Sequence, residues 1–202
     1  MLPYFLPVDT VAMKGERLLY SKGIKRMNIV IRDYETKDYE VCRSLWVELT
    51  QHHRDIYEDP SIGGDDPGRG FDRYLENPQR QGTWVAEYDG QVIALAGLLA
   101  HSHTEEGRAG IQGEVDPVVV SLPYRDKGIG TRLIEHAVEQ AREIGVSFLS
   151  IQPAARNERA ISLYVRLGFN VLGEVTLLQD LSSSHDRKWK PGIKILDNEL
   201  RY

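Results

Sequence analysis

Residues 118–133 read VVVSLPYRDKGIGTRL, a run of β-branched residues followed by two glycines and then an apolar helical stripe. The pattern predicts a strand, a turn and a helix in direct succession. Gly128 and Gly130 lie at the turn, where the first N–H groups of a helix have no intrahelical partner and carry the positive end of its dipole. Glycines let the backbone approach an oxygen closely, and Arg125 and Lys127 add positive charge. The stretch therefore predicts a phosphate-binding turn, and the alternative is that the glycines only shape a strand-to-helix connection.

The glycine spacing excludes two common nucleotide-binding loops. A mononucleotide loop needs its lysine directly after the second glycine, whereas Lys127 precedes both glycines here. A dinucleotide fingerprint needs a third glycine, and Leu133 occupies that position. The identity of the phosphate ligand therefore depends on the rest of the chain.

The composition is that of one globular domain with appendages. The chain has 202 residues, of which 41% are apolar and 27% charged, which is enough for one sizeable core. A net charge of −5 argues against a general nucleic-acid binder. The lone Cys42 excludes a disulfide framework and suits a reducing cytoplasm. No apolar run is long enough to span a membrane, and residues 1–26 are interpreted as an N-terminal extension of unknown role.

The residues on either side of the turn predict a mixed α/β sheet. Asp89-Gly90 is a strong hairpin signal, and we predict a loop over 103–112. We predict strands at 28–33, 83–88, 91–100, 114–122, 146–153 and 169–178, and an edge strand at 192–196. We predict helices that begin after 36, near 71, after 128 and after 157. This order predicts about six to seven strands, both parallel and antiparallel, with helices on both faces.

Two motifs in this order resemble those of the Gcn5-related N-acetyltransferases, the GNAT superfamily. The first is the signature R/Q-x-x-G-x-G/A after a strand, which Arg125, Gly128 and Gly130 match. The second lies about thirty residues downstream in NERAISLYVRLGF, residues 157–169, and comprises an asparagine, an LY pair and a GF pair. The resemblance covers roughly residues 28–178. It implies an acetyltransferase domain over 27–180, with central parallel strands that splay apart, and leaves 181–202 as a C-terminal tail.

The resemblance implies a binding site for acetyl-CoA. The pantetheine arm would pair with the backbone of one strand, the pyrophosphate would rest on the turn, and two residues of the later motif would contact the cofactor. In this sequence these positions are Val118, Val119, Val120, Arg125, Asp126, Lys127, Gly128, Ile129, Gly130, Thr131, Asn157 and Tyr164. Pro117 and Pro153 support the splay independently, because proline cannot donate a ladder hydrogen bond; the alternative is that both are ordinary strand-end prolines.

Three residues are candidates for the chemistry of acyl transfer. The resemblance places Tyr164 where a tyrosine reaches the CoA sulfur, so Tyr164 is the candidate general acid; the alternative is core packing. Glu114 and Asp116 lie two apart on a strand, so their side chains share a face roughly 6–7 Å apart. We prefer Asp116 to Glu114 as the general base, and the alternative is a pair of solvated carboxylates.

The acceptor is predicted to be the amine of a small molecule or a peptide. Five acids in the first helix and its loop would attract a cation, although a solvated loop is the plainer interpretation; they are Asp55, Glu58, Asp59, Asp65 and Asp66. The His52-His53 and His101-x-His103 pairs lack further ligands at a recognisable spacing, so we predict no metal site. The tail could cover a sheet edge of its own or a neighbouring subunit, which makes a homodimer one possible assembly. The competing function is a non-catalytic CoA-binding sensor.

Overall fold

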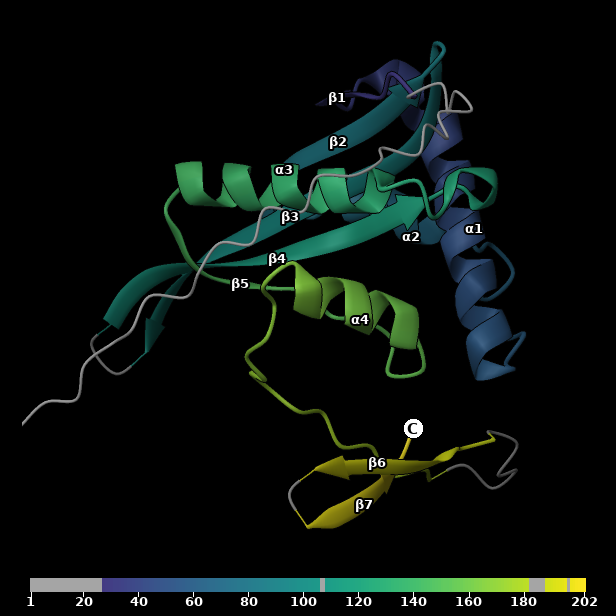
Figure 1. Ribbon diagram of the computed structural model, residues 1–202, viewed down its shortest axis with the longest axis vertical. Helices are drawn as coiled ribbons and strands as arrows, with labels where there is room; N and C mark the ends of the chain where they lie inside the picture. Colours follow the sequence, from purple (N-terminus) through teal and green to yellow (C-terminus); the bar gives the residue numbers. More distant parts are fainter. Residues whose placement is uncertain (1–26, 106–107, 182–187, 196) are drawn as a thin grey trace, which may run out of the picture.

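The computed structural model describes residues 27–105, 108–181, 188–195 and 197–202. Its central feature is a twisted sheet of five strands in chain order, from β1 to β5 (Figure 1). The strands are β1 (Val30–Asp33), β2 (Arg80–Tyr88), β3 (Gln91–Glu105), β4 (Arg108–Val120) and β5 (Val146–Ser150). The first four pair antiparallel, and β5 pairs parallel to β4. The predicted mixed α/β class is therefore confirmed.

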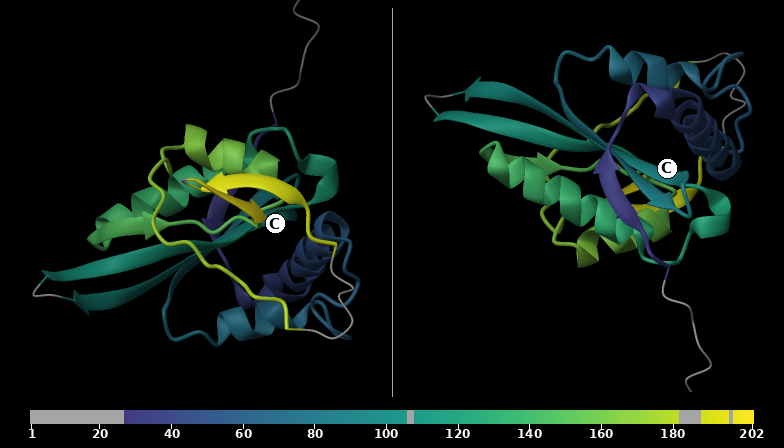
Figure 2. Two further views of the ribbon diagram at one scale, coloured as in Figure 1. Left: turned by 90° about the horizontal axis from the view of Figure 1, so that it is seen from below. Right: turned by 90° about the horizontal axis from the view of Figure 1, so that it is seen from above.

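Helices cover both faces of this sheet (Figure 2). The α-helices are α1 (Tyr39–Tyr57), α2 (Arg69–Leu75), α3 (Ile129–Glu143) and α4 (Glu158–Arg166), and short 3₁₀ turns occur at η1 (Thr36–Asp38) and η2 (Leu122–Tyr124). Helices α1 and α2 lie on one face, whereas α3 lies on the other. No helix of the described residues is long and apolar enough to cross a membrane.

The sequence explains the close packing of α3 on the sheet. Its buried stripe contains Leu133, Ile134 and Ala137, and it meets the small side chains of Ala94 and Ala96 on β3. Small residues on the sheet let the helix approach closely, so the larger α3 side chains fill the space between them. This packing fixes the N-terminal end of α3 beside the end of β4.

The predicted hairpin is present, but its strands are longer than expected. Asp89 and Gly90 both have positive φ angles, 49° and 75°, as a tight two-residue turn between β2 and β3 requires. The loop predicted over 103–112 is wrong, because β3 runs to Glu105 and β4 begins at Arg108. Backbone pairing between the two strands continues to Glu105 and Arg108, so tertiary pairing overrides the weak local strand signal.

The prediction for the C-terminal strands is also wrong. Residues 169–178 form no strand, and the segment predicted as an edge strand lies in β6 (Pro191–Ile195). That strand pairs only with β7 (Asn198–Arg201), in a separate two-stranded sheet. The physical reason is that hydrogen bonds and ion pairs hold this hairpin at the end of α1, away from the β5 edge (Figure 1). The central sheet therefore has five strands instead of six or seven. The extension predicted at 1–26 lies outside the described residues.

Candidate active site

The parallel pairing of β4 and β5 ends partway along the sheet, and the stretch of β4 beyond that point is called the slot. Their parallel pairing begins at Ile111 with Val146 and ends at Glu114 with Ser150, after which β5 stops. Strand β4 continues to Val120 and pairs there only with β3. Among the described residues, no strand pairs with the β5 side of β4 over residues 115–120. The predicted splay of the central parallel strands is confirmed.

A bulge in β4 lies at the start of this slot. Val115 pairs with Leu98 and Val118 pairs with Ala96, so Asp116 and Pro117 together face the single residue Gly97. The Asp116–Pro117 peptide bond is cis. A Cβ on Gly97 would overlap the Tyr74 hydroxyl and lie 2.6 Å from the Asp116 carbonyl oxygen. Only glycine at this position lets the neighbouring strand approach the bulge that carries Asp116.

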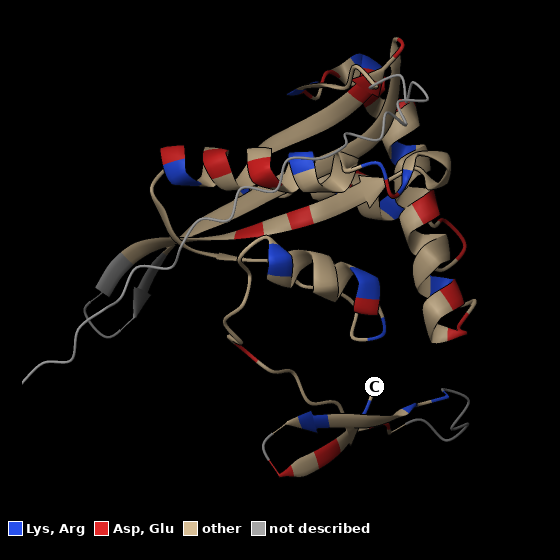
Figure 3. Ribbon diagram, in the orientation of Figure 1, with Lys and Arg blue, Asp and Glu red and all other residues tan. Residues whose placement is uncertain are grey.

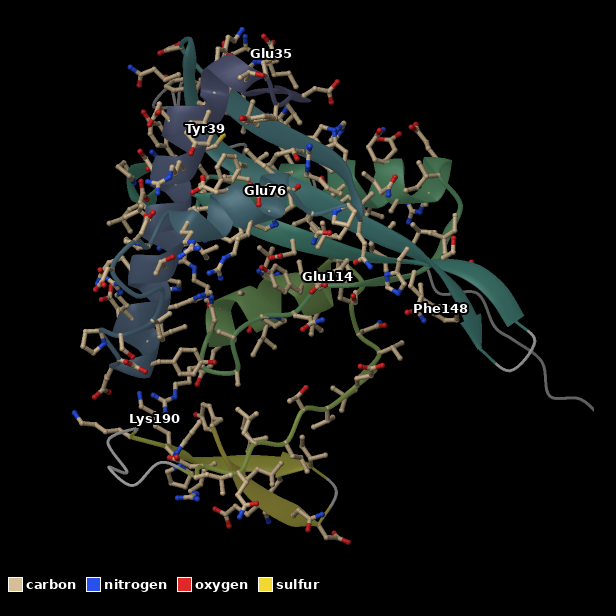
Figure 4. All side chains as sticks on the ribbon, turned by 180° about the vertical axis from the view of Figure 1, so that it is seen from behind. Glu35, Tyr39, Glu76, Glu114, Phe148 and Lys190 are labelled. Carbon is tan, nitrogen blue, oxygen red and sulfur yellow. The ribbon has the colours of Figure 1, made fainter. Side chains whose placement is uncertain are left out.

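The two candidate carboxylates lie at this bulge. Partial desolvation raises the pKa of Asp116, although its side chain is still exposed, and burial together with the charge of Asp116 raises the pKa of Glu114. Val115 packs against the core under α3, and successive strand residues point to opposite faces, so Glu114 is directed away from α3. Figure 4 shows the Glu114 side chain between the sheet and α4. The pair therefore forms a local concentration of negative charge with raised proton affinity.

Tyr164, on α4, lies near enough to Asp116 for the carboxylate to act on its phenol electrostatically. Its ring packs edge-on against Phe169, with centroids 6.4 Å apart, and the Phe169 amide donates to the Tyr164 carbonyl. Burial and the charge of Asp116 raise the pKa of its phenol, which keeps the hydroxyl protonated near neutral pH. The structure thus brings together an acidic residue of β4 and a phenol of α4 that are far apart in sequence.

The predicted phosphate turn lies at the other end of the slot. Gly128 has a φ of 77° and is the N-cap of α3, and a Cβ there would meet no atom within 4 Å. A Cβ on Gly130 would contact only Val120, at an ordinary 3.6 Å. Open space therefore borders the turn at Gly128, and the first N–H groups of this 15-residue helix, at Ile129, Gly130 and Thr131, have no intrahelical partner. These features fit a phosphate group held by backbone donors and the helix dipole.

The charged side chains of this turn have internal partners. Arg125 Nε donates to the Val120 carbonyl at 2.9 Å, and Lys127 Nζ donates to the Pro123 carbonyl at 2.8 Å. Lys127 also lies 5.2 Å from the centre of the Tyr124 ring. Asp126 is in an ion pair with Arg159 of α4. Arg125 and Lys127 thus brace the turn while keeping positive charge beside it.

Asn157 has the local role that its position predicts. Its Oδ1 accepts from the Ala160 amide at 3.1 Å and so caps α4. Its Nδ2 lies 3.4 Å from His52 Nε2 on α1. The α4 N-terminus is therefore in contact with α1, the helix whose acids and following loop are predicted to attract the acceptor.

Sequence reasoning missed three residues around the slot: Tyr74, whose hydroxyl lies at the bulge; His52, which contacts Asn157; and Arg156, which contacts the end of α1. A signal existed for His52, which lies seven residues after Leu45 and three after Leu49 and so continues the inward face of α1. The sequence holds no comparable signal for Tyr74 or Arg156, because Tyr74 meets the bulge opposite Gly97 and Arg156 meets Ile56, and both contacts join residues that are distant in the chain.

Of the five acids predicted to attract the acceptor, Asp66 and Glu58 are engaged in ion pairs with side chains of known position. Arg43 lies 2.6 Å from the Asp66 carboxylate, and Glu58 pairs with Lys188 at 3.1 Å and with Lys190 at 3.8 Å. Figure 3 shows acidic positions along α1 and the loop that follows it. Within the described part of the chain, no group of three or more His, Cys, Asp or Glu side chains could hold a metal ion.

Comparison of the sequence with known proteins identifies the family. The sequence model of the Acetyltransferase (GNAT) family matches residues 44–169, more than half of the chain. The chain is similar to N-acetyltransferase 8 of Rattus norvegicus, with 30% identity over 109 residues that cover 52% of this chain and 48% of the relative. It is also similar to spermidine N(1)-acetyltransferase of Escherichia coli, with 30% identity over 110 residues that cover 52% of this chain and 53% of the relative. The matched segments span about half the length of these curated relatives.

Solved structures share the fold. An acetyltransferase of Trypanosoma brucei is 24% identical with a TM-score of 0.56, covering 76% of this chain and 100% of the other. A predicted acetyltransferase from Clostridium acetobutylicum, crystallised with acetyl-CoA, is 21% identical with a TM-score of 0.58, covering 75% and 96%. At these identities the likeness establishes the arrangement of helices and strands.

Proposed function

Since this chain belongs to the GNAT acetyltransferase family, we propose that it transfers an acetyl group from acetyl-CoA to the primary amine of a small molecule or a peptide, by direct attack in a ternary complex. The observation that carries this proposal is the convergence of Asp116, Glu114 and Tyr164 beside the slot between β4 and β5. An amine acetyltransferase needs an acceptor for the ammonium proton and a donor for the leaving sulfur at one place.

The cofactor would occupy the slot and the turn. Backbone groups of Val118, Val119 and Val120 on the free edge of β4 would hold the pantetheine arm, and the amides of Gly130 and Thr131 would hold the pyrophosphate. Bound acetyl-CoA would supply an activated acetyl thioester. Asn157 would contact the cofactor while it caps α4.

Asp116 is the proposed base. Its raised pKa makes it a better proton acceptor than an ordinary aspartate. Together with Glu114 it would also attract a cationic amine, so the two carboxylates supply both recognition and deprotonation. The 30% identity with a spermidine acetyltransferase supports a cationic acceptor.

Tyr164 is the proposed acid. Because burial and Asp116 raise the pKa of its hydroxyl, Tyr164 Oη holds its proton until a strongly basic sulfur develops nearby. A backbone N–H near Val118, freed by the bulge, is the proposed donor to the carbonyl oxygen that gains charge.

The test is acetyl transfer from labelled acetyl-CoA to pools of polyamines, aminosugars, amino acids and basic peptides. Mass spectrometry identifies the product, and thermal stabilisation by CoA is the control for binding. We expect one pool to be acetylated, and Tyr164→Phe to lower kcat by about 10²-fold or more with CoA stabilisation unchanged. Stabilisation by CoA without a product from any pool would favour the non-catalytic sensor. Full activity of Tyr164→Phe would remove the acid assignment.

We also propose a homodimer and a cytoplasmic location. The unpaired edge of β5 exposes 74% of Phe148, and the extended segment after α4 exposes 86% of Val171 and 74% of Leu178. A second copy of the chain could cover both surfaces at once. Light scattering after size-exclusion chromatography tests the dimer, and Phe148→Lys should weaken it. The free, buried Cys42 is compatible with a reducing cytoplasm.

A further inference from the structure

The C-terminal end of α1 is capped by a residue from a distant segment. Arg156, which follows β5, directs Nη1 to the carbonyls of Ile56 and Tyr57 at 3.4 and 3.3 Å. Its guanidinium carbon lies 5.1 Å from the centre of the Tyr57 ring. The last carbonyls of a helix have no intrahelical partner and carry the negative end of the dipole, so a cation is favourable there. Arg156 thus ties the segment before α4 to α1.

The same guanidinium also holds the C-terminal hairpin. Arg156 Nε donates to the Tyr202 carbonyl at 3.0 Å, and Nη2 donates to the Lys188 carbonyl. Glu58, the residue that ends α1, pairs with Lys188 and Lys190. Figure 4 shows Lys190 beside the lower end of α1. Three segments that are distant in sequence therefore meet at one side chain.

The next residue of the chain makes a second link between the same two helices. Asn157 Nδ2 can only donate, so His52 Nε2 accepts across the 3.4 Å that separate them. His52 is half-buried on the last turns of α1, and Asn157 Oδ1 simultaneously caps α4. Adjacent residues thus attach the α4 N-terminus to α1 at two points.

We propose that His52 and Arg156 are positioning residues of an α1–α4 clasp, through which occupancy of the CoA site is transmitted to the last turns of α1 and to the C-terminal hairpin. The proposal rests on the proposed function, because Asn157 belongs to the cofactor site. CoA that fixes Asn157 in place would also restrict the groups that Asn157 contacts, including the last turns of α1. An acceptor that then binds against α1 would lose less conformational entropy on binding. By linkage, the acceptor would strengthen CoA binding by the same factor.

Hydrogen–deuterium exchange with and without CoA tests the clasp. In the wild type we expect CoA to slow exchange in residues 118–131 and 157–164 and also in 50–58 and 188–202. In Arg156→Gln and in His52→Ala the protection should stay within the first two segments, and the Kd for CoA should rise about 3- to 10-fold. Arg166→Gln is the matched control, because this exposed arginine lies at the other end of α4; it should behave as the wild type.

Each outcome distinguishes the two proposals. Protection that never reaches 50–58 in the wild type, or that reaches it equally in Arg156→Gln, would overturn the clasp and leave the proposed function intact. No CoA binding by the wild type would overturn both. Should Arg156→Gln fail to fold, Arg156→Lys keeps the charge but cannot contact all three segments with a planar fork; we expect it to transmit only part of the protection, and full transmission would contradict the assignment.

Discussion

Gly97→Ala should destabilise the protein strongly, because the added methyl group has no room. The ideal Cβ position overlaps the Tyr74 hydroxyl and lies 2.6 Å from the carbonyl oxygen of Asp116. One obstacle is backbone in the bulge, and the other is a buried side chain that is only 4% exposed. Neither is the free end of a flexible side chain, so the β3–β4 pairing or the tyrosine must move.

The expected magnitude follows from what Tyr74 would lose. Its hydroxyl lies 2.9 Å from the Gly82 carbonyl and 2.8 Å from Thr83 Oγ1. Overpacking costs about 1–3 kcal/mol, and a buried polar group left without its partner costs about 1–3 kcal/mol more. We therefore expect the free energy of unfolding to fall by about 2–6 kcal/mol, which corresponds to a Tm lower by about 5–20 °C for a chain of this size. Displacement of the bulge should also move Asp116, so acetyl transfer should fall in the protein that remains folded.

Thermal and urea unfolding measure this loss, and a double-mutant cycle with Tyr74→Phe locates it. Removal of the hydroxyl relieves one of the two overlaps, so Gly97→Ala should cost less in the Tyr74→Phe background than in the wild type. Gly173→Ala is the matched control, because a Cβ there meets nothing within 4 Å. A loss below about 1 kcal/mol for Gly97→Ala, or equal losses in both backgrounds, would refute the reasoning from the bulge.

Three further predictions concern the site and the core. Asp116→Asn should lower kcat/KM by about 10²–10⁴-fold. It should not lower Tm at pH 7, because desolvation raises the folded-state pKa of Asp116 and its ionised form therefore adds no stability to the fold. The side chain is exposed, so the effect on Tm should be small, and a clearly lower Tm would contradict the direction of the pKa shift. Gly130→Asp should leave Tm unchanged or higher, because an acid suits the first turn of α3, but should weaken CoA binding at least about tenfold by calorimetry; unchanged affinity would remove the phosphate from this turn. Cys42 should resist iodoacetamide at pH 8 until urea unfolds the protein, because burial raises its pKa to about 12; rapid labelling of the native protein, followed by mass spectrometry, would contradict its burial.

Local signals in the sequence determined much of this fold. Asp89-Gly90 marks its hairpin because positive φ angles are tolerated there. The stripe after Gly128 marks α3 because helical periodicity places it on one face. Asn157 marks the start of α4 because its side chain satisfies an amide three residues ahead. Each of these features depends on neighbours within a few residues, so residue type and spacing in the sequence are enough to predict it.

Tertiary structure alone decided which groups meet. Pairing along the sheet extended β3 and β4 through a stretch that reads as a loop, and docking on α1 carried the C-terminal hairpin away from β5. The approach of Tyr164 to Asp116 depends on where β4 leaves β5, and the contacts of Arg156 join segments up to 100 residues apart. Such contacts arise from the packing of whole elements and from the closure of long loops, so no short stretch of the sequence encodes them.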